Sequence, residues 1–166
     1  MLNLNIANVG EGLKKSDSIA QPAELDLDKT EEFHYPLHIA FSVEKIGRNI
    51  FVDSEIRTKV DFLCDRCGEL FNQHMTESAR LIYTYDGDMA NKEEDDVYVI
   101  SESTTIIDVS EPIRQTLLVA VPQKKVCRRE CKGLCDRCGA NLNVESCNCH
   151  TDSMDPRWEA LRNLIK

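Results

Sequence analysis

The sequence predicts an α+β protein, in which an antiparallel β-meander of barrel-like form carries one packed helix and is followed by a cysteine-rich tail. Apolar and polar side chains alternate over long stretches of the first half, which is typical of half-buried strands. A stretch near 109–121 changes to helical periodicity, and six cysteines crowd into the 23 residues from Cys127 to Cys149. We therefore predict a β-rich body at 1–122 and a tail at 123–166.

The predicted strands follow one another along the body. Residues 2–6 alternate and predict a short strand, whereas Gly10, Gly12 and the charged stretch 14–32 are expected to form a loop. Four later stretches have the composition of strands, the first three with apolar side chains at every second position: 37–44, 50–60, 71–85 and 97–100. A turn at 47–49 separates the first two, so neighbouring strands should pair antiparallel.

One helix is predicted to pack on this sheet. Four apolar side chains recur at every fourth position, which places them on one helical face: Val109, Ile113, Leu117 and Val121. Asp108 or Ser110 can cap the helix, Pro112 suits its first turn, and Pro122 ends it.

A second helix is predicted at the C-terminus. Asp155 would cap it, Pro156 would take the first helical position, and Trp158, Leu161 and Ile165 would share one face. This spacing favours a packed Trp158, and the alternative is that its ring stacks on a nucleic-acid base.

Composition and charge restrict the class of protein. The net charge of −9 and the pI of about 4.9 argue against a protein that coats nucleic acid without sequence preference. No apolar run of about 18 residues and no basic start followed by an apolar stretch are present, so we expect neither a membrane span nor a secretory signal. We therefore expect a cytoplasmic protein, in which disulfides are rare.

The cysteines include a repeated pentapeptide. The letters CDRCG at 64–68 recur at 135–139. In such a knuckle both thiolates face a metal ion, backbone N–H groups bond the first sulfur, and glycine adopts the positive φ that closes the turn. Each knuckle supplies half of a tetrahedral site, so two knuckles predict two sites.

The other four cysteines complete these sites. Cys147 and Cys149 are the local partners of the second knuckle, which leaves Cys127 and Cys131 for the first. The predicted ligand sets are Cys64, Cys67, Cys127 and Cys131 in one site, and Cys135, Cys138, Cys147 and Cys149 in the other. Five alternatives stay open: His150 replaces Cys149, one of the eight thiols is free, the cysteines are buried reduced thiols, they form disulfides, or a metal site is shared across a dimer.

Two zinc ions, each bound by four cysteines, are the predicted cofactors, and the tail is read as a zinc-knuckle segment. Zinc with four thiolates leaves no position for water or substrate, so its predicted role is structural. The histidines at 34, 38, 74 and 150 lack metal-ligand spacing, and no phosphate-binding glycine loop, dinucleotide fingerprint or nucleophile elbow is present. We expect no enzymatic activity.

Basic residues gather at the start of the tail. The stretch 124–137 has six basic and two acidic side chains, a local charge of +4 against −13 for the remaining chain. We predict phosphate contacts from Lys124, Lys125, Arg128, Arg129, Lys132 and Arg137. The alternative is that these side chains only offset the negative charge of thiolate-bound metals.

The tail resembles that of a known family. The runs CKGLCDRCGANLN at 131–143, CNC at 147–149 and DPRW at 155–158 resemble the YceD family, the large ribosomal RNA subunit accumulation proteins. Asp136 stands where many relatives have proline and Glu130 where many have aspartate, and neither change removes a ligand. The resemblance implies a bacterial cytoplasmic factor needed for 23S ribosomal RNA accumulation.

These observations lead to one main hypothesis and two alternatives. The main hypothesis is a non-enzymatic ribosome-biogenesis factor that binds precursor ribosomal RNA or a large-subunit assembly intermediate through its basic zinc tail. Its acidic body would suit a basic ribosomal protein. The alternatives are a rubredoxin-like iron redox carrier and a zinc-ribbon regulator that binds duplex DNA.

Overall fold

The computed structural model describes residues 1–7, 9, 12–86 and 96–149. Within these ranges the strands are β1 (Asn3–Asn5), β2 (Gly12–Ala20), β3 (Leu37–Ile46), β4 (Asn49–Leu63), β5 (Leu70–Thr84), β6 (Val97–Val99) and β7 (Ile106–Asp108). The helices are a 3₁₀ turn, η1 (Pro22–Leu25), and α1 (Ser110–Ala120). The predicted terminal helix and Trp158 lie outside the described residues.

The strands form an open five-stranded sheet and a separate two-stranded one. The large sheet has the order β2-β3-β4-β5-β6, and its first four strands are an antiparallel meander. The part of this meander that the sequence predicted is β3-β4-β5. The predicted barrel-like form is wrong, because β2 and β6 lie at opposite edges of the sheet and do not pair with each other. β6 also runs parallel to β5 and pairs with only its last three residues, Ile82–Thr84.

The predicted loop at 14–32 is also wrong in its first part. β2 pairs antiparallel with β3 from Gly12↔Lys45 to Ala20↔Leu37. Most of its side chains are exposed on both faces, so the strand lacks the alternation that marks a half-buried strand. Backbone pairing with β3 therefore holds an edge strand whose side chains give no strand signal.

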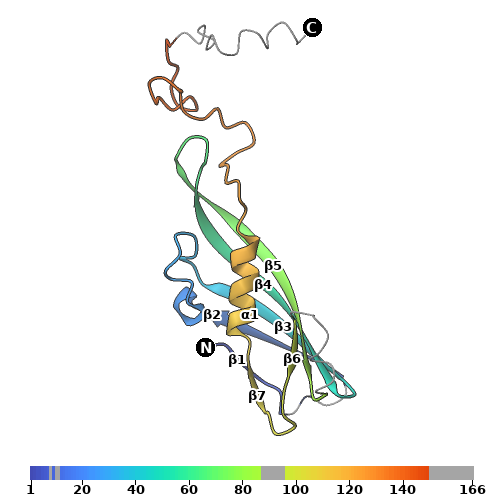
Figure 1. Cartoon of the computed structure of the whole chain (residues 1–166). Helices are drawn as coiled ribbons and strands as arrows, with labels where there is room; N and C mark the ends of the chain where they lie inside the picture. The colour runs from blue at the N-terminus through green and yellow to red at the C-terminus, as the bar shows by residue number, and fades with distance from the viewer. Residues whose placement is uncertain (8, 10–11, 87–95, 150–166) are drawn as a thin grey trace, which may run out of the picture.

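Helix α1 covers one face of the large sheet (Figure 1). Val109, Ile113 and Leu117 are completely buried there, as their spacing predicted. Val109 is the N-cap residue, and Asp108 Oδ1 accepts the backbone N–H of Ser110 at 2.9 Å. The Ser110 hydroxyl instead accepts the N–H of Leu2 at 2.6 Å, which ties the N-terminus to the helix.

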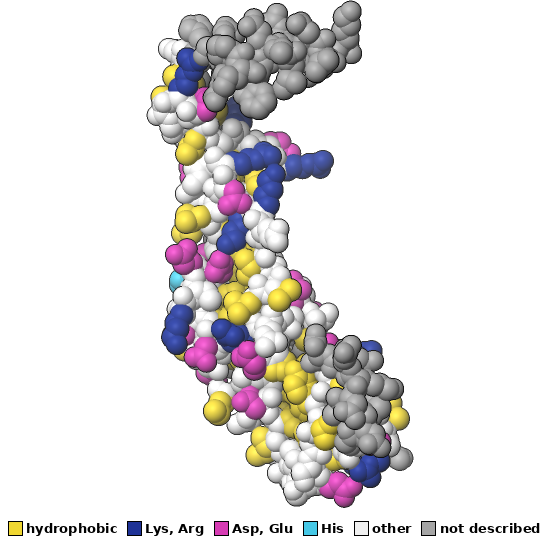
Figure 2. All heavy atoms as spheres, in the orientation of Figure 1, with side chains coloured by type: hydrophobic (Ala, Val, Ile, Leu, Met, Phe, Trp, Pro, Cys, Tyr) yellow, Lys and Arg dark blue, Asp and Glu magenta, His cyan; other side chains and the backbone are white. Residues whose placement is uncertain are grey.

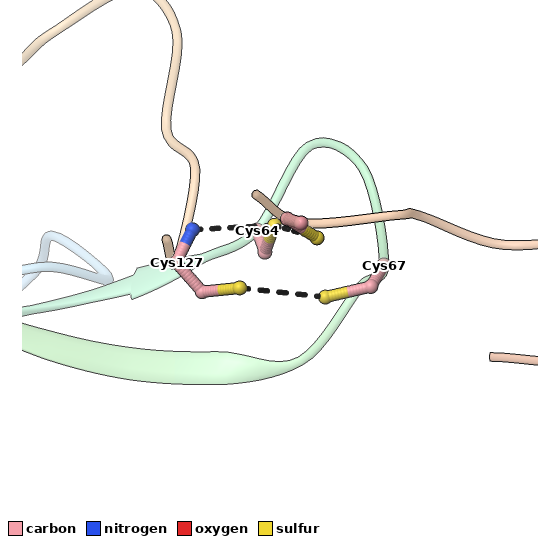
Figure 3. A group of neighbouring side chains, drawn as sticks. Cys64, Cys67 and Cys127 are labelled. Carbon is pink, nitrogen blue, oxygen red and sulfur yellow. Dashed lines mark hydrogen bonds between the residues drawn. The ribbon is translucent and has the colours of Figure 1, made fainter. Parts of the chain in front are cut away.

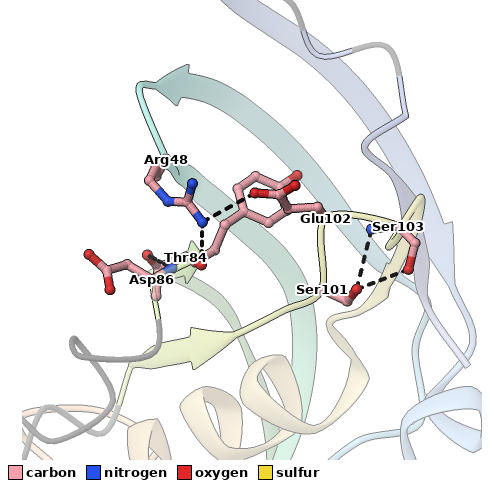
Figure 4. A network of polar contacts seen from close by, with 7 residues as sticks. Arg48, Thr84, Asp86, Ser101, Glu102 and Ser103 are labelled. Carbon is pink, nitrogen blue, oxygen red and sulfur yellow. Dashed lines mark hydrogen bonds and ion pairs between the residues drawn. The ribbon is translucent and has the colours of Figure 1, made fainter.

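A polar network holds the end of the sheet that is remote from the cysteines (Figure 4). Arg48, in the β3–β4 turn, donates from Nη2 to the Tyr85 carbonyl at 2.8 Å and pairs with Glu102 at 3.2 Å. The hydroxyl of Thr84 accepts the N–H of Asp86 at 3.1 Å. These contacts join the turn to the segments that follow β5 and β6.

The β4–β5 hairpin carries the fold towards the cysteine-rich segment. Each strand has 15 residues, and the pairs run to Leu63↔Leu70, well past the last β3–β4 pair, His38↔Arg57. The chain beyond α1 runs to the tip of this hairpin (Figure 1). The hairpin therefore brings Cys64 and Cys67 to the tail. No helix in the described part of the chain has the length and apolarity to cross a membrane.

Candidate metal centres

The first CDRCG sequence forms the turn at the tip of the β4–β5 hairpin. The N–H of Cys64 donates to the carbonyl of Glu69 at 2.9 Å, and the N–H of Gly68 donates to the carbonyl of Cys64 at 2.8 Å. Gly68 has a φ of 70°, which is accessible to glycine at little cost. This turn holds the sulfur atoms of Cys64 and Cys67 within 4.8 Å of each other.

The second CDRCG sequence repeats this turn. The N–H of Cys135 donates to the carbonyl of Ala140 at 2.8 Å, the N–H of Gly139 donates to the carbonyl of Cys135 at 3.0 Å, and Gly139 has a φ of 72°. In both turns the donor and acceptor residues of these two hydrogen bonds are separated by the same number of positions in the sequence. The repeated letters therefore specify a repeated backbone structure.

The first cysteine group joins the hairpin tip to the tail. The Sγ atoms of Cys64 and Cys131 are 3.8 Å apart, as are those of Cys67 and Cys127, and all four sulfurs lie within 4.8 Å of one another. Figure 3 shows the side chains of Cys67 and Cys127 pointing towards each other across this space. Four sulfurs at about 2.3 Å from a tetrahedral ion are about 3.8 Å apart, so the group fits a four-thiolate metal.

The second group lies within the tail. The sulfurs of Cys135, Cys138, Cys147 and Cys149 also lie within 4.8 Å of one another. The structure therefore brings the eight cysteines together in the two sets that the spacing predicted, and each set has the donors of a four-coordinate metal ion. Metal ligation by these thiolates stays a prediction.

The first thiol of each knuckle is already biased towards the thiolate. Burial opposes ionisation of Cys64, but the backbone N–H groups of Cys127, Cys67 and Arg66 outweigh it and lower the pKa to about 6. Backbone N–H groups of Cys138 and Arg137 lower the pKa of Cys135 to about 7.

Other thiols in the two groups hold their protons more strongly. Burial, and to a smaller extent the thiol of Cys64, raises the pKa of Cys127 to about 12. The Cys138 side chain, and to a smaller extent burial, raises the pKa of Cys149 to about 12. A metal ion would have to displace these protons, so binding would be coupled to proton release.

Backbone contacts fasten the tail to the hairpin. The N–H of Asp65 donates to the Lys125 carbonyl at 2.7 Å, and the Asp65 carboxylate accepts the N–H of Lys125 at 2.6 Å. The N–H of Cys127 donates to Sγ of Cys64 at 3.4 Å, and Arg66 donates to the Cys131 carbonyl at 2.9 Å. These bonds place Cys127 and Cys131 opposite the first knuckle.

Sequence reasoning missed two asparagines of the second loop. Nδ2 of Asn143 donates to Sγ of Cys131 at 3.4 Å, and Nδ2 of Asn141 donates to Oε1 of Glu69 at 2.7 Å. Burial opposes ionisation of Cys131, yet the Asn143 amide and the N–H of Gly133 lower its pKa. The only signal was the Asn-Leu-Asn run between the cysteines of the second group.

Five of the six predicted phosphate-binding side chains are exposed beside these groups: Lys124, Arg128, Arg129, Lys132 and Arg137. Figure 2 shows Lys and Arg side chains projecting from the molecule near its cysteine-rich end. Lys125 differs, since its Nζ lies 2.7 Å from the Glu32 carboxylate and its side chain is 24% exposed. Its charge is satisfied within the protein.

The histidines do not join the cysteine groups among the described residues. His34, His38 and His74 are exposed on or before the large sheet, away from both sulfur clusters. His150 lies outside the described residues, so its predicted alternative role as a ligand is untested.

Comparison with known proteins identifies the family. Residues 52–165 match the family model described as large ribosomal RNA subunit accumulation protein YceD. No solved structure matches the chain.

Curated relatives come from bacteria and plants. An uncharacterized protein of Mycobacterium leprae is 28% identical over 81% of this chain and 61% of its own length. The chloroplastic large ribosomal RNA subunit accumulation protein YCED homolog 1 of Arabidopsis thaliana is 26% identical over 78% of this chain and 48% of its own length. The Zea mays homolog of that name is 28% identical over 82% and 58%. The chain thus spans about half to three-fifths of the length of these relatives. It belongs to the YceD family of large ribosomal RNA subunit accumulation proteins.

Proposed function

We propose that this chain is a non-enzymatic cytoplasmic factor in ribosome biogenesis. It supports accumulation of 23S ribosomal RNA by binding the precursor RNA or a large-subunit assembly intermediate. Family membership and the names of the plant relatives support a role connected with large-subunit RNA. The five exposed basic side chains beside the cysteine groups are the observation that carries the RNA-binding part of the proposal.

Metal ions bound in the two cysteine groups would make this basic surface rigid. Lys124, Arg128 and Arg129 flank the first cysteine group, and Lys132 lies between its last cysteine and the second knuckle. Arginine and lysine side chains on an ordered backbone can bind phosphates with a smaller loss of conformational entropy than on a flexible one. The acidic remainder of the chain, with a charge of −13, repels RNA and favours contact with a basic ribosomal protein.

We propose zinc as the metal, with one ion in each group. Four thiolates leave no open coordination position, which supports a structural rather than a catalytic role. Tetrahedral thiolate groups also accept iron, and an iron-loaded chain would favour the redox-carrier hypothesis. Elemental analysis of natively purified protein decides between them: two zinc ions per chain are expected, and iron with a visible thiolate-to-iron absorption band would contradict the proposal.

RNA binding tests the basic surface directly. Affinity for a precursor large-subunit RNA would be measured at several salt concentrations with the wild-type chain and two triple-alanine variants. The tail variant removes Arg128, Arg129 and Lys132, and the control removes three exposed lysines elsewhere, Lys14, Lys15 and Lys29. The tail variant should bind at least about tenfold more weakly. The slope of the logarithm of affinity against the logarithm of salt concentration should be smaller in magnitude by about 2–3. Equal effects of the two variants would refute a specific RNA surface on the tail.

Two further outcomes separate the alternatives. A duplex DNA that competes with the RNA at equal concentration would favour the zinc-ribbon regulator. In cells, the chain should co-sediment with large-subunit precursors, and its absence from those fractions would count against the biogenesis role.

A further inference from the structure

The second cysteine loop reaches across to the first cysteine group. Asn143 lies between Cys138 and Cys147, yet its Nδ2 donates to Sγ of Cys131 at 3.4 Å. Its Oδ1 accepts the backbone N–H of Lys132 at 2.9 Å, so both ends of the amide are engaged and its orientation is determined. A side chain in the loop that connects the cysteines of the second group therefore bonds a sulfur of the first group.

Further contacts seat the second loop on the first knuckle. The N–H of Leu134 donates to the Arg66 carbonyl at 3.0 Å, and the Asn141 amide donates to the Glu69 carboxylate at 2.7 Å. Gly133 lies so close that an added Cβ would be 3.0 Å from the Arg66 carbonyl oxygen. These bonds all cross between the two knuckles, so each knuckle forms part of the other's surroundings.

The path of the chain makes these contacts depend on closure of the second group. Asn143 is in the loop that leaves the second knuckle and returns with Cys147 and Cys149. If those two cysteines were not held against Cys135 and Cys138, the loop would gain conformational freedom, and the Asn143–Cys131 bond would have to offset that entropy. A metal ion in the second group would remove this cost.

We propose that the two cysteine groups form one coupled two-metal unit, in which metal binding at either group strengthens binding at the other and Asn143 is the positioning residue that links them. This inference rests on the proposed metal binding. Hydrogen bonds from outside the ligand set orient metal ligands, and their loss typically reduces metal affinity by about 10–100-fold. By linkage, the strengthening must be the same in both directions.

Repulsion between the two centres opposes this coupling. Each divalent metal with four thiolates has a net charge of about −2, and like charges destabilise each other. The structure places compensating charge at the junction, because the Arg66 guanidinium bonds the Cys131 carbonyl at 2.9 Å. N–H donation from Asn143 to the Cys131 sulfur also withdraws charge from the first centre. We therefore expect the direct contacts to outweigh the repulsion, so that metal binding at one group strengthens binding at the other.

Cadmium titration of the full chain tests the coupling without RNA. ¹¹³Cd NMR gives a separate resonance for each four-thiolate site, and competition with a chelator gives the affinity of each. In a Cys147→Ser/Cys149→Ser variant, which disables the second group, the affinity of the first group should fall by about 10–100-fold. Asn143→Asp keeps the acceptor for Lys132 but replaces the donor by a carboxylate, and it should weaken the first group similarly while both resonances persist. Asn72→Asp, at an exposed position on β5, is the matched control and should change neither affinity.

The outcomes are distinguishable. First-group affinity within about twofold of wild type in both variants would overturn the coupling, since the loss of a hydrogen bond to a metal ligand costs more than that. A loss in the cysteine variant without a loss in Asn143→Asp would overturn the assignment of Asn143. Absence of any cadmium resonance in the wild-type chain would instead refute the proposed metal binding. Failure of RNA binding would leave the coupling intact.

Discussion

The ammonium of Lys125 lies 2.7 Å from the carboxylate of Glu32 and 5.1 Å from the centre of the Phe62 ring. Glu32 precedes β3, whereas Lys125 lies near the start of the cysteine-rich tail, so the ion pair joins residues that are 93 positions apart in the chain. The two side chains are only 24% and 21% exposed, so water and salt screen the pair less than an ordinary surface ion pair. The contact fastens the tail to the body.

Removing this lysine should destabilise the body. Lys125→Ala leaves the partly buried Glu32 without its partner, and we expect the free energy of unfolding to fall by about 1–2 kcal/mol. Urea unfolding would measure it. Lys124→Ala, at an exposed neighbouring position, should change stability by less than about 0.5 kcal/mol. A double-mutant cycle with Glu32→Ala should show a coupling of about 1 kcal/mol, and strictly additive effects would contradict the stabilising ion pair.

The packing of α1 on the sheet predicts a large difference between two of its residues. Leu117 is completely buried, whereas Val119, two positions further on, is 87% exposed. Leu117→Ala should cost about 2–5 kcal/mol because it removes buried apolar surface and leaves a cavity. Val119→Ala should stay within about 0.5 kcal/mol. Thermal unfolding followed by circular dichroism compares them, and equal losses would show that α1 does not pack through its Leu117 face.

Two glycines with similar backbone angles should respond differently to alanine. Gly133 has a φ of 78° and Gly139 a φ of 72°, so both substitutions incur the left-handed penalty of about 1 kcal/mol. A Cβ at Gly139 would meet open space, but at Gly133 it would meet the Arg66 carbonyl oxygen at 3.0 Å. Gly133→Ala should therefore reduce metal retention against a chelator more than Gly139→Ala does. The opposite order would contradict the seating of the second loop on the first knuckle.

The sequence predicts the fold where side-chain pattern and burial agree. Alternation in β3 and β4 reflects one buried face, and the four-residue spacing of Val109, Ile113 and Leu117 reflects the buried face of α1. β2 and β7 could not be found in this way. β2 is an exposed edge strand, and β7 is a three-residue strand that pairs with β1, about 100 residues upstream. Pairing with distant backbone, rather than a local pattern, makes these segments strands.

The grouping of the cysteines could be predicted because the two knuckles have the same letters and the same turn. The supporting contacts could not, since they join side chains and carbonyls far apart in the chain. Asn141 reaches Glu69, and Leu134 donates to the carbonyl of Arg66. Apart from the Asn-Leu-Asn run, nothing in their own neighbourhoods marks these partners. Only the three-dimensional arrangement of hairpin and tail pairs them.

Metal removal should loosen the two knuckles and leave the sheet intact. Without metal, the cysteine-rich segment has few buried apolar side chains, whereas the sheet and α1 share a continuous core. A structural zinc typically contributes on the order of 10 kcal/mol to folding of its segment. We expect the amides of Gly68, Cys135 and Gly139 to lose protection in hydrogen exchange on chelation, while those of Val52 and Ile56 in β4 keep theirs.

Acid should have the same effect as the chelator. Metal binding requires thiolates, and the pKa of Cys127 is raised to about 12, so binding at neutral pH releases protons and lowering the pH shifts the equilibrium towards the protonated, metal-free groups. Elemental analysis after dialysis over a pH series should show metal content falling as the pH falls, in parallel with the loss of knuckle protection. Uniform loss of protection in the knuckles and β4 would instead show that the metals hold the whole fold, and metal content independent of pH would exclude thiolate ligation.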